Sequence, residues 1–214
     1  MLTPVKQFLK STVIWRSIVK PIRSEEEIRS WHLRDRPTPP PHAIKVRNIL
    51  CLADLFDIHT LIETGTFRGD MIAATKDRFR QIISFEVFEP LAMKAKQRFQ
   101  HDTTVEIITG DSAKELPGVL ERVRYPAIFW LDGHYSGVGT GKADSETPVL
   151  AELEHIRRLR KNFRDVIIID DARAFGTEPD YPHLDQFVAT VDKMFGRRPL
   201  VANDSIFILP EERA

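Results

Sequence analysis

Short apolar runs alternate with helical patterns through most of this chain of 214 residues, and this alternation restricts the fold more than any other feature. The runs that we expect to form strands are residues 60–63, 81–86, 104–109, 127–131 and 166–170. The helical patterns between them cover residues 70–79, 90–99, 112–123 and 148–161. Strands and helices in this order predict a parallel sheet whose strands are joined by right-handed crossovers. The run 166–169 is apolar without alternation, as expected of a strand covered on both faces.

The segments that flank this alternation complete the expected sheet. A helix over residues 43–56 precedes the first strand, and a helix over residues 184–195 follows the fifth. Two short runs, residues 200–202 and 205–209, flank the turn pair Asn203-Asp204 and predict an antiparallel hairpin. The sequence therefore predicts an α/β domain of the Rossmann-like, doubly wound type. Its sheet is mostly parallel and seven-stranded, with the antiparallel hairpin at the C-terminal end.

The start of the chain differs from the rest and predicts a separate extension. Residues 3–20 have a rough apolar stripe, and residues 24–33 fit a second short helix with Ser24 as its N-cap. Four prolines fall within residues 37–41, where they favour an extended segment. We therefore expect a helical extension over residues 1–36, a proline-rich linker over 37–42 and the main domain over 43–214.

The charges of residues 3–20 are all basic, and the expected helix has more than one interpretation. A basic amphipathic helix can lie on a membrane surface as a peripheral contact. The alternatives are packing against its own domain or against a second subunit in a homodimer. No apolar run approaches the ~20 residues that span a bilayer, and no secretory signal pattern is present. We therefore expect no transmembrane segment and a cytoplasmic location.

Composition excludes several functional classes. The formal net charge is +0, so no overall field favours binding to nucleic acid. Cys51 is the only cysteine, which excludes an internal disulfide framework and any metal site built from several cysteines. A lone cysteine on a helix is expected to be a small buried hydrophobic residue.

Residues 61–70 combine an apolar run, an acid and two glycines four positions apart. Glu63 ends the run, and Gly65 and Gly69 precede a helical segment. Gly65 lets the chain turn sharply and lets a ligand approach the backbone. The helix that follows offers unpaired N–H groups and the positive end of its dipole. This layout predicts a nucleotide-binding loop between the first strand and the first helix.

A carboxylate stands at the end of each of the five expected parallel strands. Because ligands of an open parallel sheet bind outside the carboxyl ends of the strands, these acids mark the expected ligand site. Glu86 lies 21 residues after Gly65, close to the spacing expected of a ribose-binding acid. Asp111 alternatively fits a helix N-cap. The full set is Glu63, Glu86, Asp111, Asp132, Asp170 and Asp171.

From about residue 41 to its C-terminus, the chain resembles the class I S-adenosylmethionine (SAM)-dependent methyltransferases. Residues 63–69 match the first motif of that family, acid-x-Gly-x-x-x-Gly, and depart from the dinucleotide fingerprint G-x-G-x-x-G. SAM has no phosphate and carries a sulfonium cation, so an acid beside the loop suits it. The resemblance implies that Glu86 binds the ribose hydroxyls and that Asp111, with Ser112, lies beside the adenine. It further implies that the cofactor is bound by Glu63, Gly65, Thr66, Gly69 and Asp132.

Residues 129–136 and 168–173 resemble a group of small bacterial methyltransferase-like proteins. They are also similar, more distantly, to metal-dependent O-methyltransferases that tailor natural products and sugars. This resemblance implies Asp132 and Asp171 as Mg²⁺ ligands near the transferred methyl group, with Asp170 as the alternative to Asp171. It also implies that Asp132 and His134 are catalytic, His134 as general base or further ligand. Alternatively, His134 is structural, and the acids anchor loops or bind the methionine amino group.

These features predict methyl transfer from SAM to a hydroxyl oxygen of a small molecule or saccharide. The glycine-rich residues 136–142 follow the fourth strand, where they can cover a substrate, with Lys142 able to meet an anion. Arg173 would contact substrate or form a salt bridge with Asp170 or Glu178. One alternative function is that of a non-catalytic scaffold with the same fold. The other is an NAD-dependent enzyme, which Glu63 and the missing glycine spacing disfavour.

Overall fold

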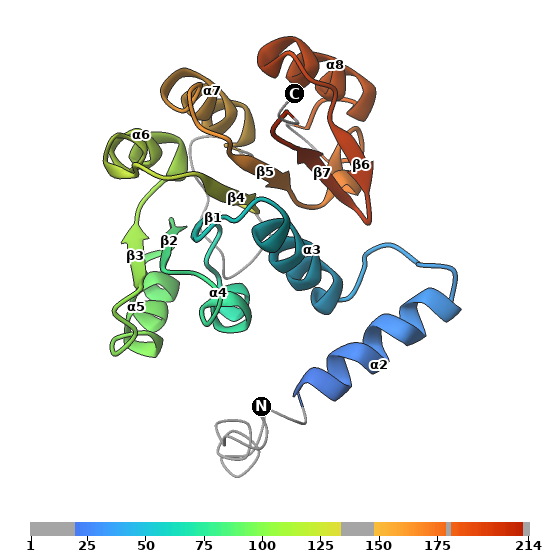
Figure 1. The fold of residues 1–214 in the computed structure, drawn as a ribbon, viewed down its shortest axis with the longest axis horizontal. Coiled ribbons are helices and arrows are strands. Elements are labelled where there is room, and N and C mark those ends of the chain that lie inside the picture. Colours follow the sequence, from blue (N-terminus) through green and yellow to red (C-terminus); the bar gives the residue numbers. More distant parts are fainter. Residues whose placement is uncertain (1–19, 134–147, 179–180, 212–214) are drawn as a thin grey trace.

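Seven strands form one sheet in the part of the chain that the computed structural model describes, residues 20–133, 148–178 and 181–211 (Figure 1). The strand order is β3-β2-β1-β4-β5-β7-β6. Strands β1 to β5 run parallel, and β7 is antiparallel to both of its neighbours, β5 and β6. The bounds are β1 Thr60–Thr64, β2 Gln81–Glu86, β3 Val105–Thr109, β4 Ala127–Leu131, β5 Val166–Ile169, β6 Leu200–Ala202 and β7 Ser205–Ile208. The predicted Rossmann-like sheet with its antiparallel hairpin is confirmed.

Helices cover both faces of this sheet and build two apolar cores (Figure 1). Helices α3 (His42–Leu55) and α4 (Asp70–Thr75) pack on one face, together with Phe99 at the end of α5 (Glu89–Arg98). Helices α6 (Ser112–Arg122), α7 (Val149–Leu159) and α8 (Leu184–Phe195) pack on the other face. All residues of β1, β4 and β5 are buried, which explains why β4 and β5 are apolar without alternation.

The hairpin turn between β6 and β7 forms where the sequence predicts it. Asn203 and Asp204 have positive φ angles of 50° and 60°, the left-handed conformation that two-residue hairpin turns require. The backbone carbonyl of Asp204 accepts a hydrogen bond of 2.8 Å from the Ala172 N–H. This contact joins the turn to η2 (Ala172–Ala174), the single 3₁₀ turn that follows β5.

Two helix boundaries differ from the prediction by more than two residues. Helix α2 is continuous from Lys20 to Leu33, so Ser24 lies inside the helix and the predicted N-cap at this residue is wrong. Helix α4 ends at Thr75, well before Phe79. The reason lies in Arg78, whose guanidinium donates to the backbone carbonyls of residues 53 and 58 and to the carboxylate of residue 54. These contacts hold the chain in a turn against the end of α3.

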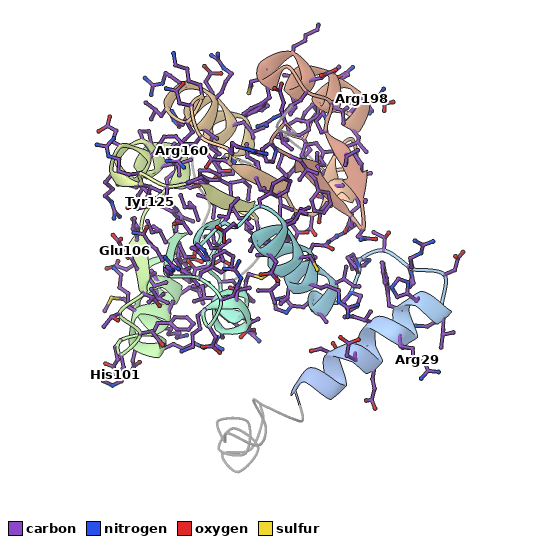
Figure 2. The ribbon with its side chains drawn as sticks, viewed as in Figure 1. Arg29, His101, Glu106, Tyr125, Arg160 and Arg198 are labelled. Atoms are coloured by element: carbon purple, nitrogen blue, oxygen red, sulfur yellow. The ribbon has the colours of Figure 1, made fainter. Side chains whose placement is uncertain are left out.

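Helix α2 packs on α3 through a small apolar cluster formed by Ile28, Trp31 and Ile44. The Trp31 indole N–H donates a hydrogen bond of 2.8 Å to the carbonyl of Pro37, which ties the proline-rich segment back to the helix. The opposite side of α2 is exposed, and Arg29 points away from the rest of the molecule (Figure 2).

The structure tests some of the remaining sequence predictions, those for Cys51 and for a membrane-spanning helix. Cys51 lies on α3 but is exposed, so the expectation of a buried cysteine is wrong. The basic segment before Lys20 and the glycine-rich segment 136–142 lie outside the described residues. Among the residues that are described, no helix is both long and apolar enough to cross a bilayer.

Candidate functional site

The five parallel strands end at one edge of the sheet, here called the carboxyl edge, and the predicted acids lie along it. Strand register places Glu63 of β1 beside Ser84 of β2, and Glu86 ends β2. Asp111, Asp132 and Asp170 follow β3, β4 and β5 within one or two residues. The topology therefore brings together side chains that are far apart in the sequence, as the strand-end pattern predicts.

Gly65 makes the sharp turn at the end of β1. Its φ is +86°, and a Cβ at this position would lie 2.3 Å from the backbone oxygen of Asp132. Its N–H and that of Thr66 both donate to the carbonyl of Phe85 at 3.0 Å. Gly69 is the N-cap of α4 and also has a positive φ, +71°. The loop thus depends on glycine for its conformation and for its close contact with the chain after β4.

Glu86 is held in a fixed orientation by this loop and by the chain just after β2. Its Oε2 accepts a hydrogen bond of 2.7 Å from the Phe67 N–H, and its Oε1 accepts one of 2.9 Å from the Phe88 N–H. The residue is buried, with 6% of its surface exposed. Each carboxylate oxygen has further acceptor capacity, so the carboxylate can still accept two hydrogen bonds from a diol.

Glu63 lies deeper, in a buried chain of hydroxyl contacts. The Ser84 hydroxyl donates to its Oε2 at 2.5 Å, and Ser84 also contacts the Thr66 hydroxyl at 2.6 Å. Burial raises the pKa of Glu63 to about 8, against the lowering effect of the Ser84 hydrogen bond. The negative charges of Asp132 and Glu86 raise this pKa further. Glu63 therefore holds a proton near neutral pH.

The residues after β3 are engaged with helices. Asp111 caps α6, because its Oδ1 accepts a hydrogen bond of 3.0 Å from the Ala113 N–H. The Ser112 hydroxyl donates to Oε1 of Glu152 on α7 at 2.5 Å. Burial raises the pKa of Glu152 to about 7. The sequence gives no sign of this contact, because Glu152 resembles any acid in the first turn of a surface helix.

Three carboxylates, Asp132, Asp170 and Asp171, form the group that we call the acid triad. One oxygen from each lies within 4.8 Å of the other two. Burial raises the pKa of Asp170 to about 7, as does the charge of Asp132, while Lys45 lowers it. The triad unites residues that the sequence predicts as metal ligands, although Asp170 and Asp171 both take part instead of one replacing the other.

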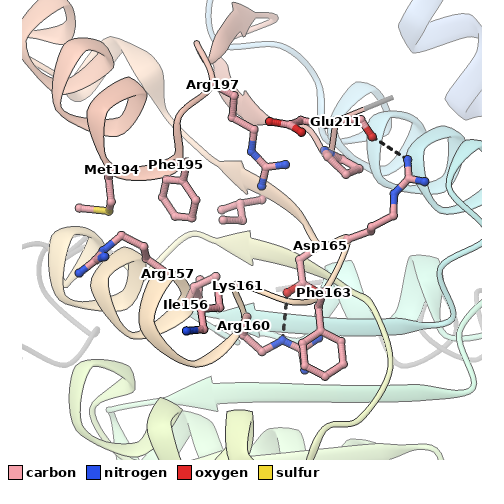
Figure 3. A pocket seen from close by; sticks show the side chains of 13 residues that line it. Ile156, Arg157, Arg160, Lys161, Phe163, Asp165, Met194, Phe195, Arg197 and Glu211 are labelled. Atoms are coloured by element: carbon pink, nitrogen blue, oxygen red, sulfur yellow. Dashed lines mark hydrogen bonds and ion pairs between the residues drawn. The ribbon is translucent and has the colours of Figure 1, made fainter. Parts of the chain in front are cut away.

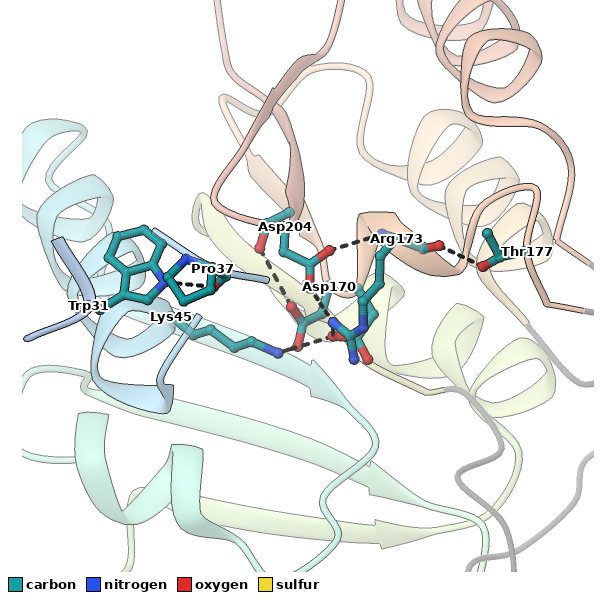
Figure 4. A network of polar contacts seen from close by, with 9 residues as sticks. Trp31, Pro37, Lys45, Asp170, Arg173, Thr177 and Asp204 are labelled. Atoms are coloured by element: carbon teal, nitrogen blue, oxygen red, sulfur yellow. Dashed lines mark hydrogen bonds and ion pairs between the residues drawn. The ribbon is translucent and has the colours of Figure 1, made fainter. Parts of the chain in front are cut away.

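Lys45 on α3 enters the acid triad, which sequence analysis does not anticipate. Its ammonium group donates to Oδ2 of Asp170 and, at 3.1 Å, to Oδ1 of Asp171 (Figure 4). Burial lowers the pKa of Lys45, but attraction to Asp170 and the other two acids outweighs this effect and raises the pKa above its ordinary value. The group therefore carries a positive charge at neutral pH.

Arg173 forms ion pairs, but with different partners from those predicted. Its Nη1 lies 2.7 Å from Oδ1 of Asp171 and also binds Oδ2 of Asp204 (Figure 4). Asp204 also accepts the Arg173 backbone N–H at 2.9 Å. The hairpin turn thus fixes the chain just after β5 and orients Asp171, whose own φ is +55°.

With its side chains in this arrangement, the acid triad is poorly suited to bind a divalent ion. Mg²⁺ prefers hard oxygen ligands such as these carboxylates. However, Asp170 and Asp171 already bind the ammonium group of Lys45. An ion held by the same two carboxylates would lie next to that positive charge and be repelled by it. His134, the predicted base, lies outside the described residues.

A separate cavity of about 460 Å³ lies at the opposite, amino edge of the sheet (Figure 3). It is lined by the end of α7, the chain that leads into β5, the end of α8 and residues 210–211. Arg160 and Asp165 form a buried ion pair in its wall, with 2.7 Å between Nη2 and Oδ1. None of the strand-end acids of the carboxyl edge lines this cavity.

Comparison with known proteins gives structural matches only. No protein-family model matches the chain, and no curated protein matches it in sequence. An O-methyltransferase from Bacillus cereus in complex with S-adenosylhomocysteine (SAH) superposes with a TM-score of 0.56 at 14% identity, over 97% of each chain. The SAH-bound methyltransferase PaMTH1 of Podospora anserina superposes with a TM-score of 0.56 at 16% identity, over 87% of this chain and 88% of that one.

The O-methyltransferase TomG of Streptomyces achromogenes, involved in tomaymycin synthesis and in complex with SAM, gives a TM-score of 0.53 at 17% identity. The match covers 97% of this chain and 96% of TomG. Likeness at such low identity is evidence of a common fold. The chain therefore has the Rossmann-like fold of the class I SAM-dependent methyltransferases.

Proposed function

We propose that this protein transfers a methyl group from SAM to a hydroxyl oxygen of a small molecule or saccharide. The observation that carries the proposal is the placement of Glu86 at the carboxyl edge. Its carboxylate is oriented by two backbone N–H groups and lies beside the glycine turn of β1. This is the position from which an acid can accept hydrogen bonds from both hydroxyls of a ribose.

The charges along the carboxyl edge support a cofactor without phosphate. The charges of Glu86 and Asp132 act on the buried Glu63 beside the loop at Gly65, and they raise the cost of placing a further negative charge there. SAM brings a sulfonium cation and an amino group, which such a site attracts. The solved structures that share the fold include methyltransferases in complex with SAM or SAH, which agrees with this assignment.

Roles for the other residues follow from their positions. Gly65, Thr66 and Gly69 form the loop against which the cofactor would lie, and Asp111 would approach the adenine from the start of α6. Because the Ser112 hydroxyl is directed to Glu152, we assign Ser112 to the adenine site through its backbone only. The acceptor would lie closer to the acid triad than the adenine does, beside Asp132, the first residue after β4. His134 stays our proposed general base.

The proposal contains no step that needs a metal ion, because Lys45 engages two of the three carboxylates that would hold one. The chemistry itself requires alignment of acceptor oxygen, methyl carbon and sulfur, with removal of the acceptor proton. A non-catalytic scaffold with this fold would need no cofactor, so binding of SAM or SAH is the first property to measure.

Isothermal titration with SAH tests the proposal, with Glu86→Ala as the decisive variant. The full-length wild-type chain should bind SAH. We expect the variant to bind at least about 100-fold more weakly, since each hydrogen bond to a charged group contributes about 1.5–3 kcal/mol. Glu89→Ala is the matched control, because Glu89 is exposed three residues further along and should not affect binding.

Thermal denaturation without ligand shows whether each variant is folded. Glu86→Gln, which keeps the size of the side chain, provides a second variant if Glu86→Ala is unstable. Failure of the wild-type chain to bind millimolar SAH contradicts the proposed function. Equal SAH affinity of the wild-type and Glu86 variants contradicts the role of Glu86.

A further inference from the structure

Lys45 is placed at the acid triad by the packing of α3 on both sides. The preceding residue, Ile44, is buried against Ile28 and Trp31 of α2. One turn later, Ile49 is fully buried against the sheet. The side chain of Lys45 therefore starts from a fixed point between α2 and the carboxyl edge. Only 16% of that side chain is exposed.

The ammonium group binds carboxylates that are largely removed from water. The side chain of Asp170 is 1% exposed and that of Asp171 is 11% exposed. Buried charges of one sign require opposite charges nearby. Here Lys45, which is 125 residues away from Asp170 in the sequence, supplies one. Arg173 supplies a second positive charge at the outer side of Asp171.

A divalent ion in the acid triad would need the same oxygen atoms. Mg²⁺ and Mn²⁺ bind carboxylate oxygens directly, Mg²⁺ at about 2.0–2.1 Å. The ammonium group lies within hydrogen-bonding distance of Asp170 Oδ2 and Asp171 Oδ1. An ion coordinated by those oxygens would be in near contact with the ammonium, and the two positive centres would repel each other.

We propose that Lys45 is a built-in cation that takes the place of a divalent ion between Asp170 and Asp171. The wild-type chain then binds no divalent ion at the acid triad, and loss of the ammonium group turns the triad into a metal site. In this proposal, the ammonium group of Lys45 occupies the place of the Mg²⁺ ion that the sequence resemblance implies.

A consequence for catalysis rests on the proposed function. An ammonium group has three N–H donors. Among the described residues, the ammonium group of Lys45 donates to Asp170 and Asp171. A further N–H can donate to the acceptor oxygen as it loses its proton. Lys45 would then supply, without a metal, the positive charge that stabilises a developing alkoxide.

Titration with Mn²⁺ alone tests the proposal independently of cofactor binding. The proteins are the wild-type chain, Lys45→Met, the double variant Lys45→Met/Asp170→Asn, and Lys94→Met as control, since Lys94 is exposed on α5. We expect Lys45→Met to bind Mn²⁺ at least about tenfold more tightly than the wild type, because a like charge has been removed from contact distance. The control should behave as the wild type, and the double variant should lose the gain.

Two results would overturn the proposal. One is saturable Mn²⁺ binding by the wild-type chain that Asp170→Asn abolishes, a result that needs no lysine variant and so decides the matter even if Lys45→Met does not fold. The other is a folded Lys45→Met protein that gains no affinity for Mn²⁺. Neither result depends on SAH binding, so failure of this proposal is distinguishable from failure of the proposed function.

Discussion

Buried ion pairs occur at both edges of the sheet, and their charge balance differs. At the amino edge, Arg160 and Asp165 form a pair with one charge of each sign and side-chain exposures of 0% and 4%. The Arg160 guanidinium also donates to the carbonyls of Val123 and Tyr125, and Asp165 accepts the Ala127 N–H. Nearly every polar group of this pair has a partner within the protein, as expected of a structural ion pair.

Among the described residues of the carboxyl edge, the acids outnumber the cations. Lys45 and Arg173 face the three acids of the triad and Asp204. Glu63 lies nearby and is kept neutral by a raised pKa. A fold gains no stability from collecting like charges, so we interpret the excess as part of the proposed site for a positively charged cofactor. We therefore expect the ion pair of the amino edge to stabilise the fold, and we propose that the charges of the carboxyl edge serve ligand binding.

The largest effect is expected at the amino edge. Asp165→Ala leaves the Arg160 guanidinium buried without a counter-charge and the Ala127 N–H without an acceptor. Loss of one partner of a buried pair costs about 3–5 kcal/mol, which urea denaturation would detect as a much lower midpoint. Asp54→Ala is the control, because the Asp54 side chain is 71% exposed and its pair with Arg78 should contribute about 1 kcal/mol or less. Similar midpoints for the two variants would contradict the structural role of Asp165.

A smaller effect that depends on pH is expected at Glu63. Its folded-state pKa of about 8 lies above its ordinary value of 4.5, so the folded chain holds a proton that the unfolded chain releases. This contribution to stability is fully present below the ordinary value and is lost as pH rises through the folded-state pKa. We therefore expect the unfolding free energy of wild type to fall relative to that of Glu63→Gln between pH of about 5 and about 8.

Chemical denaturation at a series of pH values measures this difference. Each unit of pKa displacement corresponds to about 1.4 kcal/mol, so the change should be on the order of a few kcal/mol. Glu89→Gln, at an exposed position, should show no such trend. A constant difference between Glu63→Gln and wild type across the pH series would show that Glu63 is ionised throughout.

The smallest effect is expected for Arg173→Ala. The Arg173 side chain is 43% exposed, so water partly screens its pairs with Asp171 and Asp204, whose own side chains are 11% and 2% exposed. We expect a loss of about 1–2 kcal/mol in urea denaturation, between the values for an exposed and a buried pair. A loss as large as that of Asp165→Ala would mean that the carboxyl edge also carries part of the fold's stability.

Local patterns in the sequence were sufficient to predict the strands, the hairpin and the edge of the sheet at which the acids lie. Apolar runs such as residues 166–169 reveal buried strands, and the turn pair Asn203-Asp204 places the hairpin. Parallel connections then force the strand ends to one side, so Glu63, Glu86 and Asp132 meet at one edge without further information. These features follow from the spacing of residues along the chain.

Contacts between distant segments could not be predicted in this way. Lys45 and Asp170 are separated by 125 residues, and Ser112 and Glu152 by 40. Each of these residues would suit a solvated helix surface or a cap, and no spacing rule joins them. Helix α4 likewise ends early because Arg78 binds groups of α3.

The sequence thus determines the sheet and the excess of acids at its carboxyl edge, because both depend on local periodicity and chain direction. The packing of helices determines which charges meet there. Whether the acid triad faces a metal ion or the ammonium group of Lys45 depends on the position of α3 over the sheet, which the burial of Ile44 and Ile49 fixes.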